Sequence, residues 1–147
     1  MKKFKFTLES LKKYNEQILD SEKNILGSLR VQLSELEMQL SDKYHAYEQA
    51  LKKLEELLAS CTTAMKISLH KKYISSLQQD MYRIRAQIDN KKEEIEIQLE
   101  KVVEATKEVS KLEKLEEQQI EEYKHAEQKE TEQFIEEFVS SSNFYEN

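Results

Sequence analysis

The sequence predicts an all-α protein, a long two-helix antiparallel coiled-coil hairpin with its turn near residues 59–64. Three observations predict this class: 35% of the 147 residues are charged, the chain has one glycine and no proline, and apolar residues recur at alternating steps of three and four. The scarcity of glycine and proline disfavours the tight turns of a sheet and leaves long helices unobstructed. With only 8% aromatic residues, a wide globular core is not expected.

The first helix is expected over about residues 4–59. Its predicted seam, the apolar stripe that packs on the other helix, runs through Leu8, Leu11, Asn15, Ile18, Glu22, Ile25 and Leu29. After an extra step of four it continues through Leu33, Leu36 and Leu40, and after a second extra step through Tyr44, Tyr47, Leu51, Leu54, Leu58, Cys61 and Met65. Extra steps of this kind unwind a supercoil locally without ending it.

The second helix is expected over about residues 63–139, followed by a disordered tail over 140–147. Its predicted seam runs through Leu77, Met81, Ile84, Ile88, Lys91, Ile95, Leu99, Val102, Val109, Leu112, Leu115 or Glu116, Ile120 and Tyr123. Residues 1–147 are therefore predicted to form a single coiled-coil domain.

The turn is placed at residues 59–64 because this stretch has no charge and contains small and β-branched residues of weak helix propensity. Ser60, Thr62 or Thr63 could cap the helix that follows. Folding back here pairs residues whose numbers sum to about 122, so residues beyond about 120 would extend past the first helix. One unbroken helix that dimerises remains the alternative.

Charge and composition exclude several classes of function. Residues 74–147 carry 10 Lys or Arg and 19 Asp or Glu, and this acidic half argues against nucleic acid as a partner. No apolar run follows Lys2, Lys3 and Lys5, and none reaches the ~20 residues of a membrane span, so a cytoplasmic location is expected. The single Gly27 excludes glycine-rich phosphate loops, and no cofactor is predicted.

The sequence motifs give little support for metal binding or catalysis. Glu122 and His125 have the Glu-x-x-His spacing of di-iron bundles, but such a site needs a second motif and further glutamates from other helices. Cys61 has no recognisable histidine and orienting residue beside it. We therefore predict neither a metal site nor a catalytic site, and interpret Cys61 as a small turn residue.

Two groups of apolar residues are candidate protein-binding sites. The predicted pairing brings Tyr44, Tyr47, Tyr73 and Leu77 together near the turn, as seam packing, as an exposed binding patch or as both. The second group is a stripe near the C-terminus, on an acidic helix with no first-helix partner opposite: Phe134, Ile135, Phe138 and Val139. This stripe could pack on the hairpin, mediate self-association or insert into a partner, and insertion is favoured.

Several segments resemble the FliJ family of the bacterial flagellar export apparatus. The opening Phe4-Lys5-Phe6-Thr7-Leu8-Glu9-Ser10-Leu11 is similar to that family's aromatic-x-aromatic-x-Leu-x-x-Leu start, and Tyr73-Ile74-Ser75-Ser76-Leu77 opens the second helix. Later similar segments are Ala105-Thr106-Lys107-Glu108, Leu112-Glu113-Lys114-Leu115 and Glu121-Glu122-Tyr123. Lys12 and Ile135-Glu136-Glu137 depart from the family's usual residues.

The resemblance implies a non-enzymatic component of flagellar type III protein export that acts like the stalk subunit of a rotary ATPase. It implies binding to a FliI-like hexameric export ATPase, to an FlhA-like export gate protein and to export chaperones, in the cytoplasm and peripherally at the inner face of the cell membrane. Phe4, Phe6, Leu8 and the 126–139 stripe would engage the ATPase ring, while Tyr73 and Leu77 would face the gate. A structural or scaffold coiled-coil dimer and a prefoldin-like holdase are the alternatives.

Overall fold

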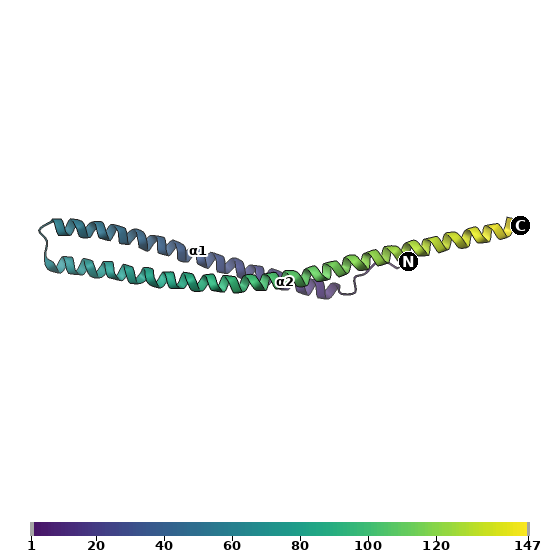
Figure 1. Ribbon diagram of the computed structural model, residues 1–147, viewed down its shortest axis with the longest axis horizontal. Helices are drawn as coiled ribbons and strands as arrows, with labels where there is room; N and C mark the ends of the chain where they lie inside the picture. The colour runs from purple at the N-terminus through teal and green to yellow at the C-terminus, as the bar shows by residue number, and fades with distance from the viewer. Residues whose placement is uncertain (1, 147) are drawn as a thin grey trace. The chain divides into compact units, whose positions relative to one another are not determined.

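The structure, a computed structural model, describes residues 2–146 and contains two helices. Helix α1 spans Glu9–Ala59 and helix α2 spans Ala64–Glu146. No strand occurs among the described residues. Figure 1 shows α1 and α2 running side by side on either side of a short connection. The predicted all-α helical hairpin is confirmed.

The chain divides into two compact units. Residues Glu22–Lys101, called the hairpin unit below, contain the connection and the helical arms that it joins. Residues Met1–Ser21 and Val102–Asn147, called the terminal unit, contain the start of α1 and the remainder of α2.

The connection lies within the predicted turn and is closed by local hydrogen bonds. Ser60 Oγ donates to the Leu57 carbonyl oxygen at 3.1 Å, which satisfies one of the free carbonyl groups at the end of α1. Thr63 Oγ1 accepts from the Lys66 backbone N–H at 3.3 Å, so Thr63 is the N-cap of α2 among the three predicted candidates. Cys61 is exposed between these caps.

The seam of the hairpin unit keeps one unbroken alternation of three- and four-residue steps. On α1 the seam positions, all buried or half-buried, are Glu22, Leu26, Leu29, Leu33, Leu36, Leu40, Lys43, Tyr47, Ala50, Leu54 and Leu57. On α2 they are Ile67, His70, Ile74, Leu77, Met81, Ile84, Ile88, Lys91, Ile95 and Gln98. This spacing is the heptad repeat of a left-handed coiled coil.

Both predicted extra steps, after Leu29 and after Leu40, are therefore wrong. At the first, Leu26 and not Ile25 precedes Leu29 in the seam. Lys43 and Ala50 occupy seam positions, while the apolar residues that follow them, Tyr44 and Leu51, are exposed. Lys43 fits because its aliphatic stem packs along the seam while its Nζ reaches Asp80 Oδ2 at 3.2 Å. The seam thus keeps its heptad spacing even where the neighbouring residue is more apolar.

A small core near the connection holds the two arms together. Ala50, Ile74 and Leu77 are buried here, and Ala46, Tyr47 and Leu54 pack against them. The small Ala50 side chain allows close approach, and the half-buried His70 Nε2 lies 2.7 Å from the Ala50 carbonyl oxygen. Because a carbonyl oxygen can only accept, Nε2 carries the proton of this hydrogen bond.

A buried polar pair interrupts the apolar seam at the other end of the hairpin unit. Gln98 is 5% exposed, and its Nε2 donates to the Glu22 carbonyl oxygen at 3.0 Å and to the Glu22 carboxylate. The sequence pattern assigned this position to Leu99, which is exposed. Burying a side-chain amide without a hydrogen-bond partner costs free energy. The Gln98–Glu22 pair therefore favours the one register of the two helices in which these residues face each other.

In the terminal unit, α1 begins at Glu9 and not near residue 4. Its seam positions are Leu8, Lys12, Asn15 and Leu19, so the predicted seam positions Leu11 and Ile18 are exposed. Lys12 Nζ donates to Glu116 Oε2 at 2.6 Å, and this hydrogen bond raises the pKa of Lys12 above its ordinary value. This contact also shifts the register: residue 12 faces 116, whereas the predicted pairing placed it near 110.

Helix α2 extends beyond the predicted end at residue 139 and remains helical to Glu146. The predicted disordered tail thus differs from the structure over 140–146, while residue 147 lies outside the described residues. No glycine or proline follows residue 139, and adding residues to an existing helix costs much less than starting one.

Replacing Gly27 with alanine is expected to stabilise the protein. Gly27 lies inside α1, and a Cβ added there would meet no atom within 4 Å, so the substitution brings no clash. Alanine exceeds glycine in helix propensity by about 1 kcal/mol, which corresponds to a rise in Tm of about 3 °C. Thermal unfolding followed by circular dichroism measures this, with Ser28→Ala as the neighbouring control; an unchanged or lower Tm contradicts the continuous α1.

Candidate protein-binding surfaces

An extended N-terminal segment, residues 2–7, packs on α2 within the terminal unit. The Phe4 ring lies 5.6 Å from the Tyr123 ring, centroid to centroid, and Phe6 is 7% exposed. Tyr123 Oη donates to the Lys2 carbonyl oxygen at 2.6 Å, and Gln119 Nε2 donates to Thr7 Oγ1 at 3.4 Å. Figure 1 shows the segment beside α2.

The predicted site residues at this end therefore already have contacts inside the chain. Phe6 is buried, and Phe4 and Leu8 are half-buried. Phe4 and Leu8 thus remain partly accessible, whereas the buried Phe6 helps to hold the segment in place. The sequence pattern did not reveal the segment because it continued the helical spacing upstream of Glu9.

The C-terminal stripe lies on α2 with its apolar side chains open to solvent. Phe134 is 69% exposed and Phe138 is 68% exposed, and Ile135 and Val139 are also exposed. Acidic residues share this stretch of helix: Glu127, Glu130, Glu132, Glu136 and Glu137. Two phenylalanines one helical turn apart, on an acidic helix, form a surface suited to an apolar groove in another protein.

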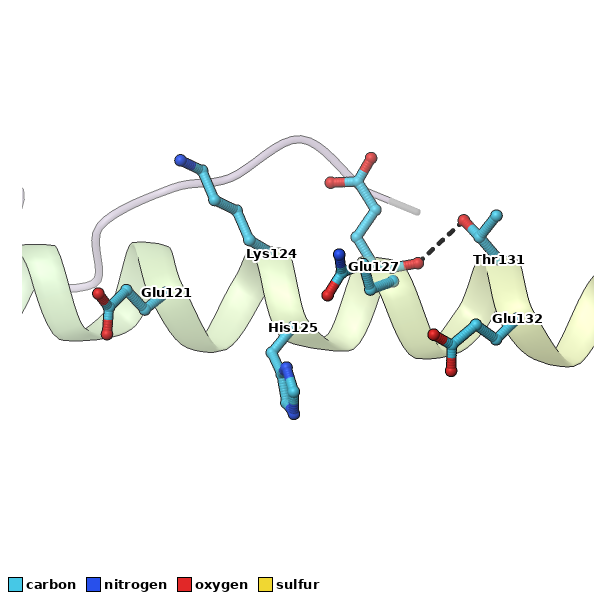
Figure 2. Close-up of a pocket in the computed structure, with 7 residues that line it drawn as sticks. Glu121, Lys124, His125, Glu127, Thr131 and Glu132 are labelled. Atoms are coloured by element: carbon cyan, nitrogen blue, oxygen red, sulfur yellow. Dashed lines mark hydrogen bonds between the residues drawn. The ribbon is translucent and has the colours of Figure 1, made fainter.

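Between the N-terminal segment and this stripe, α2 presents a polar groove. Figure 2 shows that Lys124 and Glu127 point toward the side of the N-terminal segment, while Glu121, His125 and Glu132 point elsewhere. The single hydrogen bond drawn there joins Thr131 Oγ1 to the Glu127 carbonyl oxygen at 3.0 Å. Over the described residues, no three His, Cys, Asp or Glu side chains gather in a way that could hold a metal ion.

The predicted tyrosine cluster is only partly assembled. Tyr47 packs against the core that contains Leu77, and the Tyr44 ring lies 6.5 Å from the Tyr47 ring. Tyr73 contacts His70 on its own helix, with 6.0 Å between ring centroids, and is half exposed. Leu77 is 4% exposed, so it supports the hairpin from inside, and the accessible residues of the group are Tyr44 and Tyr73.

The sequence pattern missed a second apolar stripe on α1 because it assigned those residues to the seam. Tyr44, Leu51 and Leu58 recur every seven residues, each directly after a seam position, and all three are exposed. A strict continuation of the heptad from Leu40 would have placed them outside the seam.

The described helices contain no segment long and apolar enough to cross a membrane.

Two histidines lie on the arms that the connection joins. His70 is hydrogen-bonded to the Ala50 carbonyl oxygen, and His45 pairs with Gln49 at 3.1 Å. Both histidines near the turn thus have partners other than Cys61.

These features define a two-helix coiled-coil protein that leaves several apolar side chains accessible. The chain belongs to the FliJ family, since the family model described as flagellar FliJ protein matches residues 4–145. It is therefore a coiled-coil component associated with flagellar protein export, in a family that is non-enzymatic. No curated protein and no solved structure matches the chain.

Removing the Tyr123 hydroxyl is expected to loosen the N-terminal segment. The Tyr123→Phe variant keeps the ring contact with Phe4 but loses the hydrogen bond to the Lys2 carbonyl oxygen. A net loss of about 1 kcal/mol raises the detached population roughly fivefold. Limited tryptic cleavage after Lys5 should accelerate by that factor, whereas Tyr82→Phe, at a residue 77% exposed, should leave it unchanged. Equal cleavage rates in all three proteins would contradict the packing described.

Proposed function

We propose that the protein acts as a stalk-like partner of the hexameric flagellar export ATPase, and that it also contacts the export gate protein and export chaperones. It holds no catalytic role in this proposal, and it reaches the inner face of the membrane through the export apparatus. Family membership supports the export setting. The exposed apolar stripe on the acidic C-terminal part of α2 is the observation that carries the ATPase contact.

The stripe favours insertion into a partner because nothing in the described chain covers it. Fully burying a phenylalanine or isoleucine side chain contributes roughly 1.5–3 kcal/mol, so a groove that received Phe134, Ile135 and Phe138 would gain several kcal/mol before the costs of association. All three side chains lie on the C-terminal part of α2, and all three are exposed there.

The contact with the export gate is proposed for the exposed tyrosines near the connection. Tyr73 and Tyr44 present half-exposed rings, and tyrosine combines apolar area with a hydroxyl group that can bond across an interface. The Tyr44 ring contacts Tyr47, which packs against the core of the hairpin unit, and the Tyr73 ring contacts His70. Chaperones would use the same accessible side chains, near the connection or on the C-terminal stripe.

A scaffold dimer is the weaker proposal. A parallel dimer of one long helix would need the seam of α1 for a second chain, but residues of α2 in the same chain already occupy it, as the Lys43–Asp80 and Gln98–Glu22 contacts record.

The ATPase rate and the assembly state of the flagellar export ATPase, measured with and without this protein, test the proposal. The intact protein should stimulate the ATPase and promote ring formation. The Phe134→Ala/Phe138→Ala variant should need at least tenfold more protein for half-maximal stimulation, because it loses the two most exposed apolar groups of the stripe.

The matched control is Val31→Ala/Met38→Ala, which truncates two apolar residues of comparable exposure that lie seven residues apart on the outer face of α1. This control should stimulate as the intact protein does. No stimulation by the intact protein would refute the stalk proposal, and equal loss in both double variants would refute the assignment of the contact to the stripe.

A further inference from the structure

The hairpin unit carries a face beside its seam that no residue of the unit covers. On α1, the face contains the heptad-spaced residues Tyr44, Leu51 and Leu58, which the seam leaves exposed. On α2, the corresponding positions, each directly after a seam residue, include Lys71, Gln78 and Arg85. We call this set of six residues the flanking face.

Side-chain contacts and the register of the two helices place the two halves of the flanking face next to each other. Gln78 Nε2 donates to Tyr47 Oη at 3.1 Å, and the Tyr47 ring in turn contacts Tyr44. Facing residues of the hairpin unit have numbers that sum to between 120 and 125, as in Gln98–Glu22 and Gln78–Tyr47. This register puts Lys71 across from Leu51, and in an antiparallel pair such positions lie on the same side of the seam.

Two leucines and two basic residues of this face are open to a partner. Leu51 and Leu58 present their side chains to solvent, although a seven-residue repeat is the spacing by which one helix packs on another. Lys71 and Arg85 are exposed and make no ion pair or hydrogen bond with the described residues. On the outer side of the stripe, Glu48 and Glu55 fall between the apolar residues at steps of four and three.

From this pattern we propose that the flanking face docks a single amphipathic helix of another protein, which packs heptad-spaced apolar residues on Tyr44, Leu51 and Leu58. Carboxylates on one flank of that helix face Lys71 and Arg85. Basic residues on its other flank face Glu48 and Glu55. The complex is a local three-helix bundle.

The spacing selects a helix over other occupants. Seven residues of helix rise about 10.5 Å, which matches two turns of a partner helix and not the ~6.6 Å repeat of side chains on one face of an extended peptide. A membrane surface would require a broader apolar area than three side chains interleaved with Glu48 and Glu55. Flanking charges of opposite sign orient such a helix and discriminate against wrong partners.

This inference rests on the proposed function only in assigning partner binding to the hairpin unit. Its test needs neither the export ATPase nor the gate. The probe is a synthetic three-heptad helical peptide with one leucine stripe, glutamates on one flank and lysines on the other. Its affinity for the full chain is measured by fluorescence anisotropy at low salt, because exposed charge pairs are screened by salt.

The Leu51→Glu/Leu58→Glu variant should weaken peptide binding at least tenfold while keeping the helical signal, since both side chains are already exposed in the free protein. Val31→Glu, at a residue about as exposed as Leu58 but on the outer face of α1, is the matched control and should bind as the intact protein does. No binding by the intact protein, or equal binding by the double variant, would overturn the proposal.

A charge-reversal experiment gives an independent readout. Lys71→Glu/Arg85→Glu should weaken binding of the probe peptide and strengthen binding of a peptide whose flanks are both lysine. An unchanged preference between the two peptides would overturn the charge assignment. A chain that dimerises without peptide, and becomes monomeric in Leu51→Glu/Leu58→Glu, would show that the occupant is a second copy and would also overturn the proposal.

Discussion

The seam between α1 and α2 is the constraint on which the rest of the structure depends. Its positions follow one heptad phase on each helix of the hairpin unit, even where the sequence offers Lys43, Ala50 or Gln98 in place of a large apolar residue. A shift of phase at one of these places would move every later side chain out of the interface. The protein instead accommodates each exception locally, by an ion pair at Lys43, by packing of Ala50 with Ile74 and Leu77, or by a buried hydrogen bond at Gln98.

Fixing the seam also fixes which side chains remain available to partners. Apolar residues next to seam positions, such as Leu51 and Leu58, are left at the surface because the seam phase cannot include them. At the chain ends, the N-terminal segment covers α2 around Tyr123, whereas Phe134 and Phe138 stay exposed on a single helix. A two-helix protein buries little surface. Its few apolar residues therefore either stabilise the seam or remain exposed for binding a partner.

Composition and periodicity were sufficient for the helix content, the hairpin and the turn, because each depends on many residues acting together. They failed where a single residue decided the phase. Hydrophobicity assigns Leu11, Ile18 and Leu51 to the seam, although it is occupied by their neighbours Lys12, Leu19 and Ala50. They also failed at Phe4 and Phe6, whose contacts with α2 are made by extended chain. Exposure of Phe134 and Phe138 was predictable, since no first-helix residue lies opposite them; which partner they bind cannot follow from spacing.

The most direct test of the seam is a chemical cross-link between its two helices. With Cys61 replaced by serine, a Lys43→Cys/Asp80→Cys variant should react with a short bis-maleimide within one chain, because the native side chains at these positions touch. Mass spectrometry of the product should show a cross-linked monomer at low protein concentration. In one continuous helix the two positions would lie about 55 Å apart, so cross-linked dimers without any internal cross-link would contradict the hairpin.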